Sequence, residues 1–461
     1  MDIQKFYSSI QGKRVAFCGI GGSNLPLIKI FAQRGAAVTA RDRRTEEKLG
    51  ETAGELKALG VTLRLGEGYL ENLDEDIIFR TPGMKYYLPE LNAARERGSA
   101  VTSEMEVFFD LCPCKIFAVT GSDGKTTTTT ILSEMLKAAG KTVHLGGNIG
   151  NPLLPEIESI HPDDVAVVEL SSFQLISMRR SPDVAVVTNV TPNHLDMHKD
   201  MQEYIDAKKN ILLHQNAFGR AVLNADYEIT AGFAKDVRGD RLMFSRRGRC
   251  ARGAWLNDQN EIILSLDGKD IPVMSASEIR IPGGHNIENY LAAVCALWGT
   301  VGADAMVQTA RTFSGVEHRN EFVRELDGVK YYNDSIGTTP SRTANGTLKL
   351  FDRKILLIAG GYDKKIPFDS FGPAVVDSVK TLVLMGATAD KIEQSVKASP
   401  NYREGGPKII RVQSLEEAVE ACRAEAVPGD IVSLSPACAS FDMFPNYETR
   451  GEEFKKLVER L

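Results

Sequence analysis

The chain has 461 residues, too many for one hydrophobic core, and favours about three domains. Its formal net charge of −6 argues against a protein that binds nucleic acid by neutralising phosphates, and its seven scattered cysteines favour neither a disulfide framework nor a structural zinc site. We expect a cytoplasmic protein, because no signal peptide opens the chain and no apolar run reaches the roughly 18 residues that span a bilayer.

Apolar runs with β propensity alternate with helical patterns along nearly the whole chain, which predicts parallel α/β domains. Residues 14–23 read as a strand entering a glycine turn, and residues 37–42 as the next strand, ending at Asp42. This order is similar to half of a dinucleotide-binding fold. However, Asn24 stands where the third glycine of GxGxxG is expected, so the pattern does not require NAD.

Residues 117–128 predict a phosphate-binding loop, because an apolar strand runs into Gly-Ser-Asp-Gly-Lys-Thr-Thr and then into a helical pattern. Gly121 and Gly124 permit backbone angles that let N–H groups converge on an anion. Lys125 would place a charge on the terminal phosphates, and the Thr126 hydroxyl could ligand Mg²⁺. The loop is a short variant, since Val119 occupies the place of the usual first glycine. The alternative is a glycine-rich turn without a ligand.

Two more predicted strands, residues 165–169 and 184–189, deliver polar groups near this loop. Glu169 could ligand Mg²⁺, although a helix N-cap region is the alternative. His194 and His198 have the spacing of a zinc pair, but Leu195 stands where a zinc protease needs its glutamate. We therefore expect His194 near Mg²⁺ and His198 on the surface.

Later segments carry further polar clusters. Spacing alone places Lys208 and Lys209 on an exposed helix face, and residues 239–270 predict a β-meander. Asn286 and Asn289 open an Ala-rich helix with two amides suited to a purine edge. A cation and an acid, Arg319 and Asp334, face each other across a predicted hairpin. Within residues 435–451, which combine hydroxyl, aromatic and cationic groups, apolar neighbours indicate that Cys438 is a buried structural cysteine.

Taken together, these motifs resemble the Mur ligases of peptidoglycan synthesis over nearly the whole chain. The resemblance rests on Thr120-Gly-Ser-Asp-Gly-Lys-Thr, Gly147-Asn-Ile-Gly, Glu169-Leu-Ser-Ser-Phe-Gln-Leu, Asn189-Val-Thr-Pro-Asn-His-Leu-Asp, His285-Asn, His318-Arg, Asn333-Asp-Ser, Gly360-Gly-Tyr-Asp-Lys and Leu434-Ser-Pro-Ala-Cys-Ala-Ser-Phe-Asp. It implies Rossmann-like N- and C-terminal parallel sheets (residues 1–111 and 316–461) that flank a central P-loop-type ATPase α/β domain (residues 112–315).

The resemblance also implies the reaction. ATP with Mg²⁺ phosphorylates the carboxylate of UDP-N-acetylmuramoyl-L-alanine, and the amine of D-glutamate attacks the acyl phosphate. The implied catalytic residues are Lys125, His194 and Lys208. The implied metal ligands are Thr126, Glu169, His194 and, if it is carbamylated, Lys208. The implied ATP-binding residues are Gly121, Ser122, Asp123, Gly124, Lys125, Thr126, Thr127, Asn148, Asn286, Asn289, Arg319 and Asp334. The UDP-substrate would contact Ser23, Asp42, Arg44, Gly83, Ser171 and Gln174. Glutamate would contact Thr338, Lys364, Ser440 and Tyr447.

One departure leaves the amino acid open. Ile336-Gly337 stands where the D-glutamate ligases usually have Lys-Ala, so a cation is lost beside the amino-acid site, and L-glutamate or another amino acid remains an alternative. A folylpolyglutamate synthase would share the phosphate loop, but about 110 residues precede the loop here and disfavour it. An NAD-binding or non-enzymatic Rossmann protein would leave Lys125, Glu169 and His194 without a purpose. We expect a monomer with no nucleic-acid partner and no membrane insertion.

Overall fold

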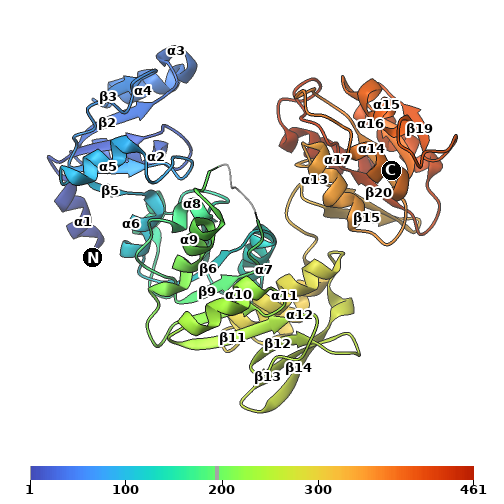
Figure 1. The fold of residues 1–461 in the computed structure, drawn as a ribbon, viewed down its shortest axis with the longest axis horizontal. Coiled ribbons are helices and arrows are strands. Elements are labelled where there is room, and N and C mark those ends of the chain that lie inside the picture. The colour runs from blue at the N-terminus through green and yellow to red at the C-terminus, as the bar shows by residue number, and fades with distance from the viewer. Residues whose placement is uncertain (1, 193–196) are drawn as a thin grey trace. The chain divides into compact units, whose positions relative to one another are not determined.

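The computed structural model describes residues 2–192 and 197–461, and the chain forms two compact units (Figure 1). Unit 1 comprises Met1–Glu278 and Ile287–Ala310, and unit 2 comprises Ile279–Asn286 and Arg311–Leu461. Three sheets rich in parallel pairs, two in unit 1 and one in unit 2, confirm the predicted α/β fold class. The predicted domain boundaries near residues 111 and 315 stay predictions.

The first sheet is wholly parallel and has the strand order β3-β2-β1-β4-β5. The order reverses beside β1, and open sheets of this kind bind ligands outside the carboxyl ends of the strands at such a reversal. The strands are β1 (Arg14–Cys18), β2 (Ala37–Asp42), β3 (Thr62–Leu65), β4 (Ile77–Arg80) and β5 (Ala100–Thr102). The helices are α1 (Ile3–Ile10), α2 (Leu25–Gln33), α3 (Glu46–Leu49), α4 (Glu51–Ala58), α5 (Pro89–Glu96) and α6 (Glu104–Leu111).

The second sheet has nine strands in the order β14-β13-β12-β11-β10-β9-β6-β8-β7. The strands are β6 (Lys115–Thr120), β7 (Val143–Gly147), β8 (Val165–Glu169), β9 (Val184–Val187), β10 (Arg220–Asn224), β11 (Asp240–Ser245), β12 (Gly253–Leu256), β13 (Glu261–Leu266) and β14 (Lys269–Ser275). The helices that follow these strands are α7 (Lys125–Ala138), α8 (Ser172–Leu175), α9 (Met201–Leu213), α10 (Glu228–Gly232), α11 (Gly284–Leu297) and α12 (Ala303–Thr312). The predicted meander holds only for β12 to β14, because β11 pairs parallel with both of its neighbours.

The third sheet, in unit 2, has the order β15-β16-β20-β17-β18-β19. Its first two strands form the predicted hairpin and the remaining pairs are parallel. The strands are β15 (Glu321–Leu326), β16 (Val329–Asn333), β17 (Ile355–Ala359), β18 (Val379–Leu384), β19 (Lys408–Arg411) and β20 (Ile431–Leu434). The helices are α13 (Pro340–Asn345), α14 (Phe371–Ser378), α15 (Ala389–Lys397), α16 (Leu415–Glu425) and α17 (Tyr447–Arg460).

Burial of the strands explains their apolar composition. Val165–Glu169 is buried at every position, as expected for a parallel strand with covered faces. One hydrophobic cluster contains Phe17 of the first sheet and Ala118 of the second, so the two sheets of unit 1 share a core. The buried Arg80 adds a polar link, because its guanidinium donates to the carbonyl oxygen of Phe173 at 2.7 Å and to Ser177 Oγ at 2.9 Å.

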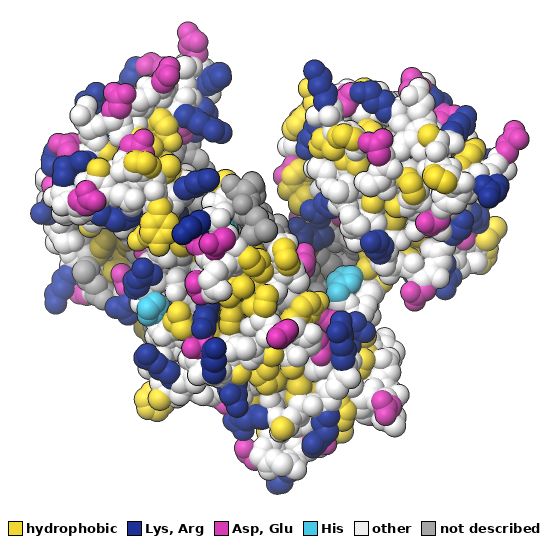
Figure 2. Space-filling model, in the orientation of Figure 1, with side chains coloured by type: hydrophobic (Ala, Val, Ile, Leu, Met, Phe, Trp, Pro, Cys, Tyr) yellow, Lys and Arg dark blue, Asp and Glu magenta, His cyan; other side chains and the backbone are white. Residues whose placement is uncertain are grey.

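The surface carries both signs of charge. On the face seen in Figure 2, Lys and Arg side chains are interspersed with Asp and Glu. Within residues 2–192 and 197–461, no helix is both long enough and apolar enough to cross a membrane.

Candidate active site

The phosphate loop lies between β6 and α7, which confirms the predicted order of strand, loop and helix. Gly121 and Gly124 have φ angles of 157° and 78°, respectively. A Cβ atom on Gly121 would lie 1.8 Å from Thr188 Oγ1, and one on Gly124 would lie 2.7 Å from Asn289 Oδ1. Glycine is therefore required at both positions by close packing, and at Gly124 also by its left-handed backbone.

The segment that follows β9 braces this loop. The Asn189 amide accepts a hydrogen bond from Asp123 N at 2.9 Å and donates one to Asp123 O at 3.2 Å. Ser122 Oγ donates to the carbonyl oxygen of Thr191 at 2.9 Å and lies 2.9 Å from the hydroxyl of Tyr204 on α9. These contacts hold the loop against the segment after β9 and against α9.

Lys125 is the first residue of α7. Its ammonium donates to the carbonyl oxygens of Gly121 and Ser122, both at 3.0 Å. Thr126 and Thr127 follow in the first helical turn and are partly exposed. The positive end of the helix dipole, the ammonium and two hydroxyl groups therefore surround one short loop, an arrangement that suits phosphate.

Glu169 ends β8, next to β6 in the sheet, and is 1% exposed. Asn148 donates to Glu169 Oε1 at 2.7 Å, whereas Oε2 is buried and has no hydrogen-bond partner among the described residues. A buried carboxylate oxygen without a donor is costly, and carboxylate oxygens are preferred ligands of Mg²⁺. Glu169 therefore fits a divalent cation, and Asn148 holds its other oxygen in place. Helix α8 is capped by Ser171 instead, which argues against the N-cap alternative for Glu169.

Lys208 on α9 is 2% exposed, so the prediction of an exposed lysine face is wrong for this residue. Its ammonium donates to Gly121 O at 2.6 Å, because this face of α9 packs toward the phosphate loop. Burial and the nearby Lys125 ammonium lower the pKa of Lys208 to about 7. Its neighbour Lys209 is only partly buried and pairs with Asp236 at 2.5 Å.

The structure tests the prediction for only one of the two histidines, His194 and His198. His194 lies outside the described residues. His198 is 5% exposed, so the prediction of a surface position is wrong. Its ring stacks on Phe173 with centroids 5.3 Å apart, and its nitrogens lie 2.9 Å from Ser172 Oγ and 3.2 Å from Glu203 Oε2.

Asp42 and Arg44 meet at the carboxyl end of β2. The Arg44 guanidinium donates to both Asp42 oxygens, at 2.9 and 2.8 Å, and Ile20 N donates to Oδ2 at 2.8 Å. Burial alone would raise the pKa of Asp42, but these hydrogen bonds and one from Arg44 N lower it to about 2. Ser23 and Gly83 follow β1 and β4, so all four predicted UDP-binding positions of this sheet lie at the strand ends where its order reverses.

Four further predicted residues already have protein partners. Ser171 and Gln174 cap α8 reciprocally, with Ser171 Oγ 2.8 Å from Gln174 Oε1. Asn289 Oδ1 accepts from Thr128 Oγ1 at 3.1 Å. Asn286, assigned to unit 2, donates to Pro282 O at 2.6 Å. Their predicted contacts with the UDP-substrate and adenine stay predictions.

In unit 2, Asp334 is 1% exposed and accepts from Ser435 Oγ at 2.7 Å and from Thr347 Oγ1 at 2.8 Å. Burial raises the pKa of Asp334, and Arg342, whose Nη2 lies 3.8 Å from Oδ1, opposes this effect. Thr347 and Arg342 are not among the predicted site residues. Both follow the Asn-Asp-Ser motif within 14 residues, but only the fold of α13 and the turn after it brings them to Asp334.

Three of the predicted glutamate-binding residues have informative surroundings. Lys364 Nζ donates to Thr338 Oγ1 at 3.4 Å, so the structure brings these two residues together. Ser440 Oγ is buried without a hydrogen-bond partner among the described residues.

The prediction that Cys438 is a buried cysteine is confirmed, and burial raises its pKa to about 11.

The glycine of the Ile336-Gly337 departure has a steric reason. A Cβ atom on Gly337 would lie 2.6 Å from Asp334 Oδ2 and 3.0 Å from Ser435 Oγ. This chain therefore has no room at position 337 for the alanine of the usual Lys-Ala pair.

Comparison with known proteins places this site in a family. Residues 119–297 match the Mur ligase middle domain, and residues 318–438 match the Mur ligase, glutamate ligase domain. The chain belongs to the Mur ligase family. The UDP-N-acetylmuramoylalanine--D-glutamate ligase of Acetivibrio thermocellus is 52% identical over 99% of this chain and 98% of its own length. The enzyme of the same name from Clostridium kluyveri is 51% identical over 98% of each chain.

A solved structure gives the same result for the fold. The crystal structure of UDP-N-acetylmuramate-alanine ligase from Thermotoga maritima covers 97% of this chain and 99% of its own, with a TM-score of 0.57 and 19% identity. At this identity the likeness concerns the fold alone.

Proposed function

We propose that this protein is an ATP-dependent ligase that joins D-glutamate to UDP-N-acetylmuramoyl-L-alanine in the synthesis of peptidoglycan precursors. Full-length relatives that are about half identical and bear that name support the substrates. The observation that carries the chemistry is the buried, unpartnered Glu169 Oε2, which lies in a site that also holds the phosphate loop and Lys208.

The first step transfers the terminal phosphoryl group of ATP to the carboxylate of the nucleotide-linked alanine, giving an acyl phosphate and ADP. In this step the N–H groups at the N-terminus of α7 and the Lys125 ammonium bind the phosphates and stabilise the charge that develops on the transferred group. Mg²⁺, held by Glu169 and Thr126 and, by resemblance, near His194, would neutralise phosphate charge. Asn148 keeps Glu169 oriented for that role.

The second step forms the amide bond. The amine of glutamate attacks the acyl phosphate carbon, loses a proton, and phosphate leaves. We propose that Lys364, Thr338, Ser440 and Tyr447 hold glutamate. Lys364 and Thr338 already lie 3.4 Å apart, and the unpartnered Ser440 hydroxyl is available to a ligand.

Lys208 has a proposed covalent role. An amine with a pKa of about 7 is about half unprotonated at neutral pH, whereas an ordinary lysine is almost fully protonated, and only the unprotonated amine adds CO₂. The resulting carbamate would replace a buried cation by an anion near the metal site. The burial of Lys208 fits this role, because a lysine that served only as a surface charge would be exposed.

A ligation assay tests the proposal. The purified protein is incubated with ATP, MgCl₂, UDP-N-acetylmuramoyl-L-alanine and either D- or L-glutamate, and ADP release and product mass are measured. We expect a product with D-glutamate, at least 100-fold more than with L-glutamate. Equal use of L-glutamate would overturn the stereochemical assignment, and ADP release without a ligated product would overturn the reaction itself.

A further inference from the structure

The turn that carries Arg319 in unit 2 has a strained backbone. His318 and Asn320, on either side of Arg319, have φ angles of 59° and 44°, in the left-handed region that residues other than glycine rarely occupy. Such residues persist only where their surroundings hold them. The contacts that hold this turn therefore fix the backbone on both sides of Arg319.

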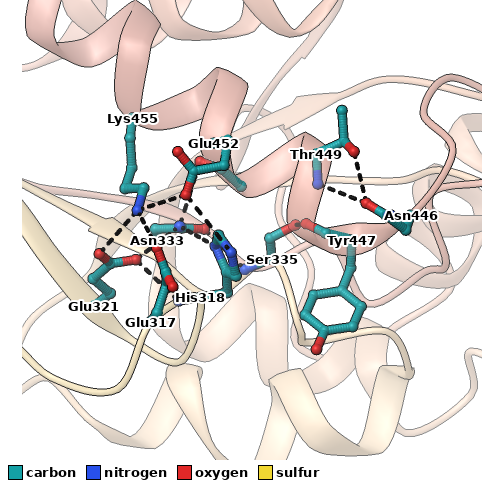
Figure 3. A network of polar contacts seen from close by, with 11 residues as sticks. Glu317, His318, Glu321, Asn333, Ser335, Asn446, Tyr447, Thr449, Glu452 and Lys455 are labelled. Carbon is teal, nitrogen blue, oxygen red and sulfur yellow. Dashed lines mark hydrogen bonds and ion pairs between the residues drawn. The ribbon is translucent and has the colours of Figure 1, made fainter. Parts of the chain in front are cut away.

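Lys455 on α17 ties both ends of the turn to one helix (Figure 3). Its ammonium lies 2.7 Å from Glu317, immediately before His318, and 3.4 Å from Glu321, which follows the turn. It also pairs with Glu452 on its own helix at 2.8 Å. Glu321 Oε2 in turn accepts from His318 N at 2.9 Å, so the network reaches the strained backbone directly.

Helix α17 lies unusually close to this turn. A Cβ atom on Gly451 would lie 2.3 Å from His318 Nδ1, so glycine is needed there for the approach. Asn333 Nδ2 lies 3.0 Å from the same ring nitrogen and donates to Glu321 at 3.1 Å. The ring is thus held between β16 and α17, as the close-up shows.

Charge makes Lys455 necessary in this network. Without its ammonium, the carboxylates of Glu317, Glu321 and Glu452 would face one another near a largely buried imidazole. The side chains of Lys455 and Glu321 are only 18% and 13% exposed, whereas those of Glu317 and Glu452 are 63% and 45% exposed, so solvent screens the repulsion least at Glu321. Glu317, His318 and Glu452 place their ligand atoms within 4.8 Å of one another, but the ammonium already supplies the cation of this cluster.

We propose that Lys455 is a positioning residue for the ligation reaction: by neutralising the three carboxylates around the His318 turn, it holds Arg319 in the conformation that binds the phosphates of ATP. This inference rests on the proposed function and on the ATP-binding role that the family resemblance implies for Arg319. Lys455 itself contacts no substrate.

The test compares Lys455→Met and Lys455→Arg with Lys456→Met, a matched control at an exposed lysine of the same helix. For Lys455→Met we expect the KM for ATP and the dissociation constant of ATP, measured by titration calorimetry, to rise about tenfold. The KM for D-glutamate should stay within about twofold of wild type. Lys455→Arg should recover most of the affinity for ATP, and Lys456→Met should match wild type.

A merely structural role gives a different pattern. General loosening of α17 would raise the KM for glutamate as much as that for ATP, because Tyr447 opens the same helix, and that result overturns the inference. Unchanged ATP binding in Lys455→Met also overturns it. If Lys455→Met does not fold, Lys455→Met/Glu317→Gln is measured in its place. Because this variant removes one of the facing carboxylates, we expect a smaller rise in the dissociation constant of ATP, and an unchanged value overturns the inference. Because ATP binding is measured without ligation, wild-type protein that binds ATP but ligates no glutamate contradicts the proposed function and not this inference.

Discussion

The carbonyl oxygen of Gly121 accepts hydrogen bonds from two lysines, Lys208 at 2.6 Å and Lys125 at 3.0 Å. Two ammonium groups on one carbonyl, one of them buried, repel each other, and burial together with this repulsion explains the lowered pKa of Lys208. The same geometry brings a candidate carbamate to the phosphate loop. Substituting each of these lysines should therefore have a different measurable effect on the enzyme.

Lys125→Ala should lower kcat by roughly 10²–10³, because Lys125 supplies charge to the transferred phosphoryl group. Phosphate release with all substrates present gives the measurement. Lys137→Ala is the control, since Lys137 is an exposed residue of the same helix α7 and pairs with Glu134. Near-normal phosphate release by Lys125→Ala would remove the basis for the phosphate-binding role.

Lys208→Ala should lose activity that added short-chain carboxylic acids partly restore, because these acids can supply the missing anion near the metal. Turnover is measured over a range of acetate concentrations. Lys209→Ala should retain activity, as it loses only an ion pair with Asp236. Full activity of Lys208→Ala in CO₂-depleted buffer would show that no carbamate is needed.

The stability of the protein should depend on pH through Lys208. In CO₂-free buffer, the unfolded chain holds this proton up to a pKa near 10.4, whereas the folded protein releases it above about pH 7. The unfolded state therefore binds more protons than the folded state between these two pH values. As a result, the contribution of Lys208 to stability falls as the pH is lowered from about 10 to 7, and it stays constant below about pH 7.

Denaturant unfolding of wild type and Lys208→Met across pH 6–10 measures this effect. The variant should gain stability relative to wild type as the pH falls through this window. A difference in free energy of unfolding that does not change with pH would mean that Lys208 keeps an ordinary pKa in the folded protein.

Arg44→Ala should raise the KM for the UDP-substrate about tenfold and leave that for ATP nearly unchanged, because Arg44 lies at the strand ends of the first sheet. Steady-state kinetics with each substrate varied in turn gives both values. Arg43→Ala, at an exposed neighbour, is the control. Equal changes in both KM values would instead assign Arg44 a structural role through its pair with Asp42.

Local sequence signals predicted the parts of this site that depend on neighbours in the chain. The phosphate loop follows from two glycines and a lysine between a strand and a helix, and the Glu321–Asn333 hairpin follows from its short turn. The burial of Lys208 was not predictable in this way, because the face of α9 that packs inward is decided by contacts such as the one with Gly121, 87 residues earlier in the chain. The positions of Arg342 and Lys455 likewise depend on tertiary contacts of α13 and α17.

The link made by Arg80 has a consequence for folding. Its guanidinium joins the first sheet to the segment after β8, and Phe17 and Ala118 belong to one continuous core. Removing either sheet would leave a buried cation and a broad apolar face in contact with water. Although the chain contains three sheets, the first two should therefore melt as a single cooperative block, and the sheet of unit 2 as a separate one.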